Sequence, residues 1–171
     1  MSVRELFYLL NVCFLLGAVV SLGLSRYPRA SSLLSNAFTL MGSLCGLLLS
    51  FHILGYGESF AIKGPTLIPW VEFSFFVDGL AAFFVLVVSI LSLAFSLYSL
   101  GYNQGYYGKS VGFLGFLANL FLLSMVWVLS ANNALAFLIF WELMTLVSYF
   151  LVVYEYEEEE SVRAGLIYLI M

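Results

Sequence analysis

The chain has 171 residues, of which 63% are hydrophobic and only 9% are charged. Soluble domains are about 45–50% apolar and about 25% charged, and a chain of this length cannot bury so much apolar surface in one soluble core. The composition therefore excludes a soluble globular domain, a disordered chain and a nucleic-acid-binding protein. It predicts an all-α membrane protein that crosses the bilayer several times.

Five stretches are long and apolar enough to cross a membrane, because a spanning helix needs about 20 mostly apolar residues. They cover about residues 6–24, 33–54, 76–100, 111–130 and 134–154, and a sixth begins over residues 162–171. No low-complexity linker interrupts them, so we expect one transmembrane domain over residues 1–171. The first stretch is long for a signal peptide, and Arg4 is offset by Glu5, so we interpret it as a retained helix.

The connection between the second and third stretches, residues 55–75, is long and contains several glycines and prolines. Its segments Phe60–Lys63 and Leu67–Phe75 are separated by Gly64 and Pro65. This pattern predicts a small hairpin that lies on the membrane surface, with its turn at the Gly-Pro pair.

Aromatic and acidic residues mark the later connections. Tyr102, Tyr106 and Tyr107 fit the aromatic belt at the level of the lipid headgroups. Glu155 and the run Glu157–Glu160 follow the fifth stretch, and we interpret them as a solvated loop and the acidic first turn of the next helix.

The basic residues predict how the chain is oriented. Cytoplasmic loops of membrane proteins carry an excess of Lys and Arg. The first, third and fifth loops share one side of the membrane and hold four such residues, whereas the other side holds two. The two groups are Arg26, Arg29, Lys109 and Arg163 against Arg4 and Lys63. We therefore expect a multi-pass protein of the cell inner (plasma) membrane with its N-terminus outside.

Glu142 is the charged residue inside the fifth stretch. It lies roughly 11–12 Å deep in a hydrocarbon core about 30 Å thick, where a carboxylate costs a few kcal/mol unless it is neutral, paired or hydrated. Thr145 and Tyr149 follow at i+3 and i+7 and share its helix face, with Ser148 beside them. The pattern favours a proton-relay carboxyl on a polar stripe. The alternative is a protonated Glu142 that makes one interhelical hydrogen bond.

Most other polar residues at membrane depth are more typical of helix packing than of proton transfer. Serines in the third stretch recur at steps of three and four, as in the small-residue stripes that let membrane helices approach closely. Asp78 precedes them and is expected at the outer interface, where a carboxylate favours a helix N-terminus. His52 is more typical of an interfacial residue than of a relay, and the third to fifth stretches contain no Lys, Arg or His. The stripe residues are Ser89, Ser92, Ser96 and Ser99, and similar small residues are Thr39, Ser43, Gly46 and Ser50 in the second stretch and Gly112, Gly115 and Asn119 in the fourth.

No pattern in the sequence indicates a bound cofactor. Cys13 and Cys45 stand alone in apolar stretches, without the spacing of a metal site or a redox pair, and we interpret them as lipid-level or packing residues. Nothing resembles a phosphate-binding loop, a catalytic triad or a zinc site. We therefore expect no cofactor in this chain and no catalytic residue of its own.

Three segments together resemble a known family. They are Phe75–Val88, Ser96–Tyr102 and Phe140–Leu151, of which the Trp-Glu-Leu sequence inside an apolar helix is the most specific part. They look like the antiporter-like proton-translocating subunits of respiratory complex I and of group 4 hydrogenases, especially the branch of hydrogenase-4 component B and formate hydrogenlyase subunit 3. The resemblance extends over most of the chain from about Phe73 onward.

The resemblance implies a function that composition does not. In that family the Glu of the fifth helix pairs with a Lys two helices later, and the pair drives a half-channel for protons; Glu142 occupies the Glu position, and the Lys would lie beyond Met171. The chain then looks like the N-terminal part of a proton-translocating subunit in a membrane hydrogenase or a complex I-like NADH:quinone oxidoreductase, with other membrane subunits and lipid as its partners. Two alternatives remain: a structural membrane scaffold, and a subunit of a multisubunit sodium/proton antiporter.

Overall fold

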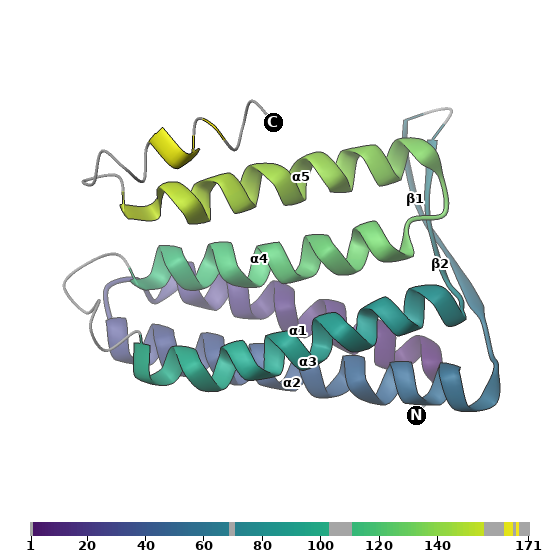
Figure 1. Cartoon of the computed structure of the whole chain (residues 1–171), viewed down its shortest axis with the longest axis horizontal. Helices are drawn as coiled ribbons and strands as arrows, with labels where there is room; N and C mark the ends of the chain where they lie inside the picture. Colours follow the sequence, from purple (N-terminus) through teal and green to yellow (C-terminus); the bar gives the residue numbers. More distant parts are fainter. Residues whose placement is uncertain (1, 69–70, 103–110, 156–162, 166, 168–171) are drawn as a thin grey trace.

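Five long helices and one β-hairpin make up the computed structural model, which describes residues 2–68, 71–102, 111–155, 163–165 and 167 (Figure 1). All five helices are long and apolar enough to span a membrane. The described chain is therefore a helical, multi-pass membrane protein, as the composition predicts, with a hairpin at one end of the bundle. The elements are α1 (Val3–Gly23), α2 (Pro28–Tyr56), β1 (Phe60–Ile68), β2 (Val71–Val77), α3 (Gly79–Tyr102), α4 (Val111–Ser130), α5 (Ala134–Val152) and the 3-10 turn η2 (Val153–Glu155).

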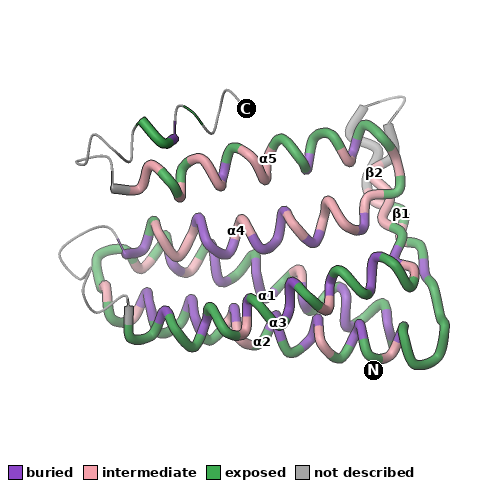
Figure 2. The backbone as a smooth tube through the Cα atoms, in the orientation of Figure 1, coloured by how far each residue is buried: buried purple, intermediate pink, exposed green. Residues whose placement is uncertain are grey.

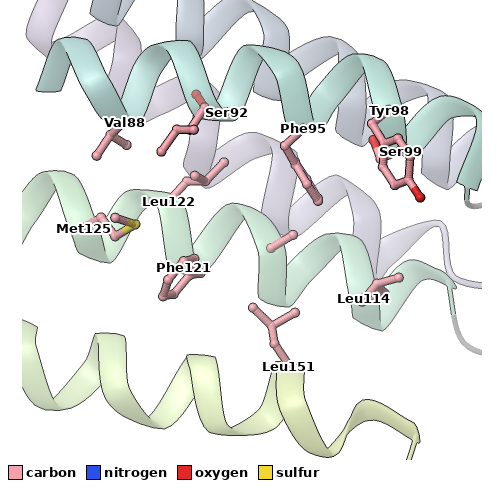
Figure 3. A pocket seen from close by; sticks show the side chains of 12 residues that line it. Val88, Ser92, Phe95, Tyr98, Ser99, Leu114, Phe121, Leu122, Met125 and Leu151 are labelled. Atoms are coloured by element: carbon pink, nitrogen blue, oxygen red, sulfur yellow. The ribbon is translucent and has the colours of Figure 1, made fainter.

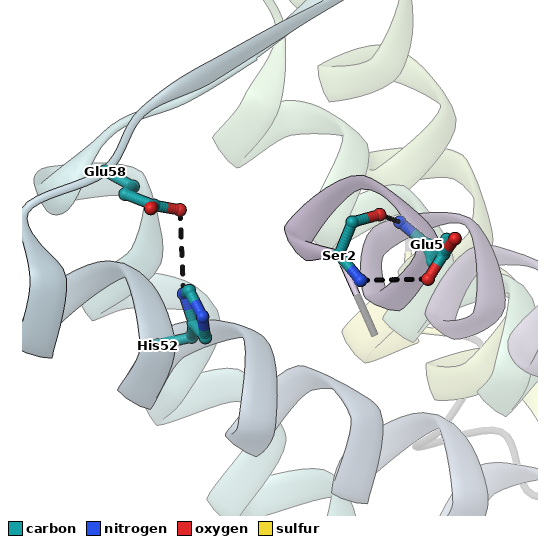
Figure 4. A network of polar contacts seen from close by, with 4 residues as sticks. All are labelled: Ser2, Glu5, His52 and Glu58. Carbon is teal, nitrogen blue, oxygen red and sulfur yellow. Dashed lines mark hydrogen bonds and ion pairs between the residues drawn. The ribbon is translucent and has the colours of Figure 1, made fainter.

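Local sequence signals set the ends of α1 and α2. Ser2 and Glu5 form a capping box at the start of α1: the Glu5 amide donates to the Ser2 hydroxyl, and the Ser2 amide donates to the Glu5 carboxylate (Figure 4). Pro28 stands at the first position of α2, where its missing N–H costs nothing. Gly57 ends α2 with a left-handed φ of 67°, which glycine adopts without a steric penalty.

Side-chain caps also begin α3 and α5. The Asp78 carboxylate accepts a hydrogen bond of 2.8 Å from the Ala81 amide, which confirms the expected role of Asp78 at a helix N-terminus. The Asn133 side chain accepts one of 2.7 Å from the Ala136 amide. Because of the Asp78 cap, α3 begins at Gly79, three residues after the expected start near residue 76, and α2 begins at Pro28, five residues before the expected start near residue 33.

The hairpin exists, but its turn is not where the sequence suggested. The strands β1 and β2 are antiparallel and run up to residues 68 and 71, so Gly64 and Pro65 lie within β1. There the register shifts: three steps along β1, from Lys63 to Thr66, oppose two steps along β2. Glycine and proline inside strands are typical of such irregular positions. The Gly-Pro pair therefore marks a bulge and not the turn.

Helix α4 lies at the centre of the bundle. It contacts α1, α2 and α3 on one side and α5 on the other. Figure 2 shows buried residues along the length of α4, whereas most residues of α5 are exposed or half-buried. The hairpin end of the bundle has an apolar core that includes Phe7, Leu10, Leu49 and Val126. In the opposite half, hydrogen bonds of Ser21, Asn36 and Asn119 also join the helices.

The serine stripe of α3 is a packing surface, as expected. Ser89, Ser92, Ser96 and Ser99 are all buried. The hydroxyls of Ser92 and Ser43 are 2.7 Å apart, and the Ser99 hydroxyl donates to the Asn36 side chain of α2 over 2.6 Å. The stripe thus joins α3 to α2 through both small size and hydrogen bonds.

The cysteines also pack inside the described bundle. Cys13 and Cys45 are buried free thiols, which agrees with packing residues. The described residues contain no group of three or more His, Cys, Asp or Glu side chains that could hold a metal ion. Of the aromatic and acidic residues expected at the interface, Tyr106, Tyr107 and Glu157–Glu160 lie outside the described residues, as does most of the sixth span.

Candidate functional site

Glu142 lies near the middle of α5, as its position in the sequence predicted. It follows Ala134 by eight residues and precedes Val152 by ten, so it is roughly 12 Å along a helix of 1.5 Å rise per residue. A carboxylate at that depth costs free energy unless another group pairs with it, hydrates it or protonates it. The surroundings of the side chain therefore decide what it can do.

The face of α5 that packs on the bundle does not include Glu142. The buried residues of the helix are Ala136, Phe140 and Val147. The Phe140 ring stacks on Phe75 of β2 with centroids 5.7 Å apart and lies 5.1 Å from the Trp127 ring of α4. At 100° per residue, Glu142 is turned about 200° from Phe140.

The carboxyl is consequently on the outer face of α5. Glu142 is exposed, as is its neighbour Trp141. Within the described residues Glu142 makes no hydrogen bond and no ion pair. The alternative expectation was that Glu142 makes one interhelical hydrogen bond. Among the described residues, no side chain or backbone group on another helix is its partner.

Thr145 and Tyr149 share this side of the helix but do not contact Glu142 through hydrogen bonds. The Thr145 hydroxyl donates to the Trp141 carbonyl over 3.0 Å, and the Ser148 hydroxyl donates to the Thr145 carbonyl over 2.8 Å. Both hydroxyls are thus satisfied within their own helix. The structure places the three expected residues on one side without joining them into a network.

Tyr149 shows which segment approaches this side of α5. Its ring lies edge-on to Phe150 with centroids 5.5 Å apart. A Cβ atom built on Gly165 would lie 3.3 Å from the Tyr149 ring, so the segment around Gly165 packs against Tyr149. Figure 1 shows the described residues after α5 on the side of α5 that faces away from α4. The outer face of α5 is therefore an interhelical surface at one end and an open one at Glu142.

His52 is remote from this face. Its Nδ1 is 3.7 Å from a Glu58 carboxylate oxygen, near the end of α2 (Figure 4), which is longer than a hydrogen bond. The His52 side chain is 36% exposed, and its ring lies 4.8 Å from that of Tyr56. This position at the hairpin end supports an interfacial role and not a relay to Glu142.

A second polar cluster lies between α1, α2 and α4. The Asn119 amide nitrogen donates to the Ser35 hydroxyl over 2.9 Å and to the Gly115 carbonyl over 3.0 Å, and its oxygen accepts from the Thr39 hydroxyl over 2.9 Å. The cluster is buried and carries no charge, since it consists of amide and hydroxyl groups. It fits the packing role that the sequence indicated for Asn119.

Sequence reasoning missed one feature, a cavity of about 450 Å³ between α3 and α4 (Figure 3). Its wall is almost wholly apolar, and Leu151 of α5 closes part of it. No motif could have revealed it, because an apolar residue that lines a groove looks the same in a sequence as one that faces lipid.

Comparisons with known proteins agree with this architecture. Residues 131–171, which include Glu142, match the family model described as NADH:quinone oxidoreductase/Mrp antiporter, TM. The chain is 33% identical over 157 residues to hydrogenase-4 component B of Escherichia coli, an alignment that covers 92% of this chain and 23% of the relative. It is 30% identical over 145 residues to NADH-quinone oxidoreductase subunit L of Rickettsia typhi, covering 81% of this chain and 21% of the relative.

A solved structure shows the same fold. The structure of the membrane-bound sulfane sulfur reductase, an archaeal respiratory membrane complex, superimposes with a TM-score of 0.75 over 95% of this chain and 33% of that chain, at 18% identity. The matches confirm the resemblance seen in Phe75–Val88 and Phe140–Leu151: the chain is similar to hydrogenase-4 component B and to NADH-quinone oxidoreductase subunit L, and its fold is that of a chain in a respiratory membrane complex. The chain spans about a quarter of the length of these curated relatives.

Proposed function

We propose that this chain contributes the mid-membrane carboxyl of a proton path within a larger membrane complex that couples electron transfer to proton transport. The complex would be a membrane-bound hydrogenase or a complex I-like NADH:quinone oxidoreductase. The observation that carries the proposal is the placement of Glu142: near the middle of α5, and on the face turned away from the bundle. A scaffold helix has no need of a carboxyl at that depth.

The position of Glu142 requires a partner from outside the described helices. The described residues of α3, α4 and α5 contain no Lys, Arg or His, and the outer face of α5 is open at Glu142. A cationic side chain on a helix docked there would stabilise the carboxylate, and its withdrawal would favour the protonated form. Proton transfer needs such a group, whose charge changes with its surroundings.

Redox chemistry belongs, in this proposal, to other subunits. The described side chains at membrane depth are apolar, hydroxyl or amide groups apart from Glu142 and the two buried thiols. In this proposal the chain is a non-catalytic membrane subunit without a cofactor of its own. Its partners are the lipid bilayer and further membrane subunits that cover the outer face of α5.

Replacement of Glu142 tests the proposal in the assembled complex. Glu142→Gln keeps the shape and hydrogen-bonding groups but cannot titrate, so proton uptake into sealed vesicles should fall by about tenfold or more. Glu142→Asp titrates but reaches about one carbon less far, so it should keep part of the uptake. Electron transfer is measured in the same vesicles, and chain content is measured by immunoblot.

A matched control is the exposed carboxylate Glu58, which lies at the hairpin end. Glu58→Gln also removes one acid and should leave proton uptake unchanged. Full uptake by Glu142→Gln at normal electron transfer would instead support a structural scaffold. In that case a bulky apolar residue at position 142 would affect only assembly.

A subunit of a sodium/proton antiporter is the second candidate function. The observation that supports it is the description of the matched family model, which names the Mrp antiporter beside NADH:quinone oxidoreductase. The two functions differ in the transported ion. Uptake of ²²Na⁺ into the same vesicles that depends on Glu142 would support the antiporter. Proton uptake that persists without sodium would support the coupled complex.

A further inference from the structure

The segment that leads into α5 is tied to the hairpin through its backbone (Figure 1). Ala131 forms an antiparallel bridge with Phe75 of β2, and the Asn132 amide donates to the Ser74 carbonyl over 2.9 Å. The next residue, Asn133, caps α5. β2 therefore holds the two residues that precede the N-cap, and the position of the first turn of α5 depends on the hairpin.

The Phe140 ring makes a second attachment, six residues after the start of α5. It is 7% exposed, and its centroid lies 5.7 Å from that of Phe75, 5.8 Å from that of Phe73 and 5.1 Å from that of Trp127. The planes of the Phe140 and Phe75 rings are only 9° apart. The Trp127 indole N–H donates to the Asn11 side chain of α1 over 2.6 Å, so the Trp127 ring is itself held in place. Phe140 thus sits between the hairpin and a fixed ring of α4.

These contacts select one rotation of α5 about its own axis. Of its three buried side chains, Ala136 and Val147 are small, and Phe140 is the large one. The opposite side of the helix gives no preference, because Leu138 and Trp141 are exposed and apolar and can face either lipid or protein. The packing of the Phe140 ring therefore distinguishes between rotations that hydropathy alone allows.

The rotation of α5 decides where the Glu142 carboxyl points. Glu142 follows Phe140 by two residues and is turned about 200° from it, so an inward Phe140 places the carboxyl on the open face. Turning the helix by about 30° would move a Cα atom, about 2.3 Å from the helix axis, by about 1.2 Å, and the carboxyl by more. Displacing a reacting group by about 1 Å can lower a rate on the order of 100-fold.

We propose that Phe140 is a positioning residue for Glu142: its ring, held by Phe75 of the hairpin and Trp127 of α4, fixes the rotation of α5 that turns the carboxyl outward. The consequence for transport rests on the proposed function of Glu142, whereas the rotation itself does not. The hairpin thereby becomes part of the site, because a displacement of β2 reaches Glu142 through Phe75 and Phe140.

Labelling from the lipid phase tests the rotation without an assay of transport. A hydrophobic diazirine is dissolved in the bilayer of vesicles that contain the full chain, and the carbene released by light inserts into side chains that face lipid. Tandem mass spectrometry measures the labelling of each residue of α5. In the native chain the exposed Leu138, Trp141 and Glu142 should be labelled several-fold more than the buried Ala136 and Val147.

Two substitutions should disturb this pattern, and a matched one should not. Phe140→Leu keeps an apolar side chain but removes the stacked ring, and Phe75→Leu removes its partner on β2 and leaves the sequence of α5 intact. Each should abolish most of the difference between exposed and buried residues. The double variant should show no further loss, because both changes remove the same contact. Phe150→Leu makes the same change at a ring of α5 that is 49% exposed and should keep the native pattern.

Circular dichroism of the same vesicles checks that each variant retains its helices. A native labelling pattern in either Phe140→Leu or Phe75→Leu would overturn the proposal. So would a lost pattern in Phe150→Leu, because α5 would then respond to any change of volume and not to the Phe140 contact.

The assembled complex shows whether the rotation matters for transport. Phe140→Leu and Phe75→Leu should lower proton uptake several-fold at unchanged electron transfer. They should also shift its pH profile, because the protonation of a carboxyl depends on its surroundings. Phe150→Leu should change neither. Normal uptake with a normal pH profile, in a chain whose labelling pattern is lost, would overturn the positioning role. Full uptake by Glu142→Gln would instead reject the proposed function, and the labelling pattern would still decide whether Phe140 fixes the rotation.

Discussion

At the scale of single residues, the bundle depends on a few positions where only a hydrogen atom fits. Asn119 is 1% exposed and joins α4 to α2 through Ser35 and Thr39. Its amide also lies against Gly17 of α1, where a Cβ atom would stand 2.6 Å from the Asn119 side-chain oxygen. Gly17 therefore allows three helices to meet around one buried amide.

This contact predicts opposite effects for two identical substitutions in α1. Gly→Ala in a helix is ordinarily stabilising by up to about 1 kcal/mol. A Cβ on Gly23 meets no atom within 4 Å, so Gly23→Ala should be neutral or stabilising. Gly17→Ala must displace Asn119 in a closely packed site and should lower the free energy of unfolding by about 1–3 kcal/mol. Denaturant unfolding in detergent micelles, followed by circular dichroism, measures both.

Asn119→Ala provides the internal control for that prediction. Asn119→Ala removes the side-chain amide with which the new Cβ of Gly17→Ala would clash. The effects of the two substitutions on the free energy of unfolding should therefore be non-additive in a double-mutant cycle. Gly17→Ala should cost much less in the Asn119→Ala background than in the native chain. If its cost were the same in both, the amide would not be the cause.

Residue-level features of the candidate site were predictable only in part. The depth of Glu142 and the shared side of Thr145 and Tyr149 follow from helix length and periodicity. The exposure of Glu142 does not, because Leu138 and Ile139 on the outer face of α5 are as apolar as Phe140 on its packed face. In a membrane both lipid and protein favour apolar surfaces, so hydropathy does not show which side packs.

At the scale of elements, the sequence predicted the helices but not the structure of the segments that connect them. Each span follows from the length of apolar sequence that a bilayer requires. The start of α3 was misplaced because Phe76 and Val77 are as apolar as the helix, although they belong to β2. That strand is also held by contacts distant in sequence, a bridge between Phe75 and Ala131 and a hydrogen bond of 2.9 Å from the Asn132 amide to the Ser74 carbonyl. No local pattern encodes them.

The two sides of α3 give a prediction at this scale. Ser92 is 1% exposed and faces Ser43, whereas Phe95 is 41% exposed. Ser92→Leu inserts extra volume between α2 and α3 and should lower the free energy of unfolding by about 1–3 kcal/mol. Phe95→Leu shortens a partly exposed side chain at the cavity between α3 and α4 and should cost less. The same detergent unfolding measurement, with assembly followed by size-exclusion chromatography, compares them, and equal stability would mean that the faces of α3 are assigned wrongly.

At the scale of the whole molecule, the two ends of the bundle differ in structure and in charge. One end carries the N-terminus, the hairpin and a predominantly apolar core. The other carries the loop between α1 and α2, and the cross-helix hydrogen bonds of Ser21, Asn36 and Asn119 lie in the half of the bundle next to it. Arg26 and Arg29 stand at that second end, and Arg4 and Lys63 at the first. Since the bundle has a fixed direction, one measurement of which end is cytoplasmic orients every element.

The excess of basic residues predicts that the end carrying Arg26 and Arg29 faces the cytoplasm. An alkaline phosphatase reporter is active only outside, and a green fluorescent protein reporter folds only inside. Fusions after Arg29 and Lys109 should therefore fluoresce without phosphatase activity, and a fusion after Lys63 in the hairpin should show the reverse. Arg26→Gln with Arg29→Gln removes half of the basic residues on the cytoplasmic side and should yield a mixed population. A fluorescent fusion after Lys63 in the native chain would contradict this orientation and place the end with Arg26 and Arg29 outside.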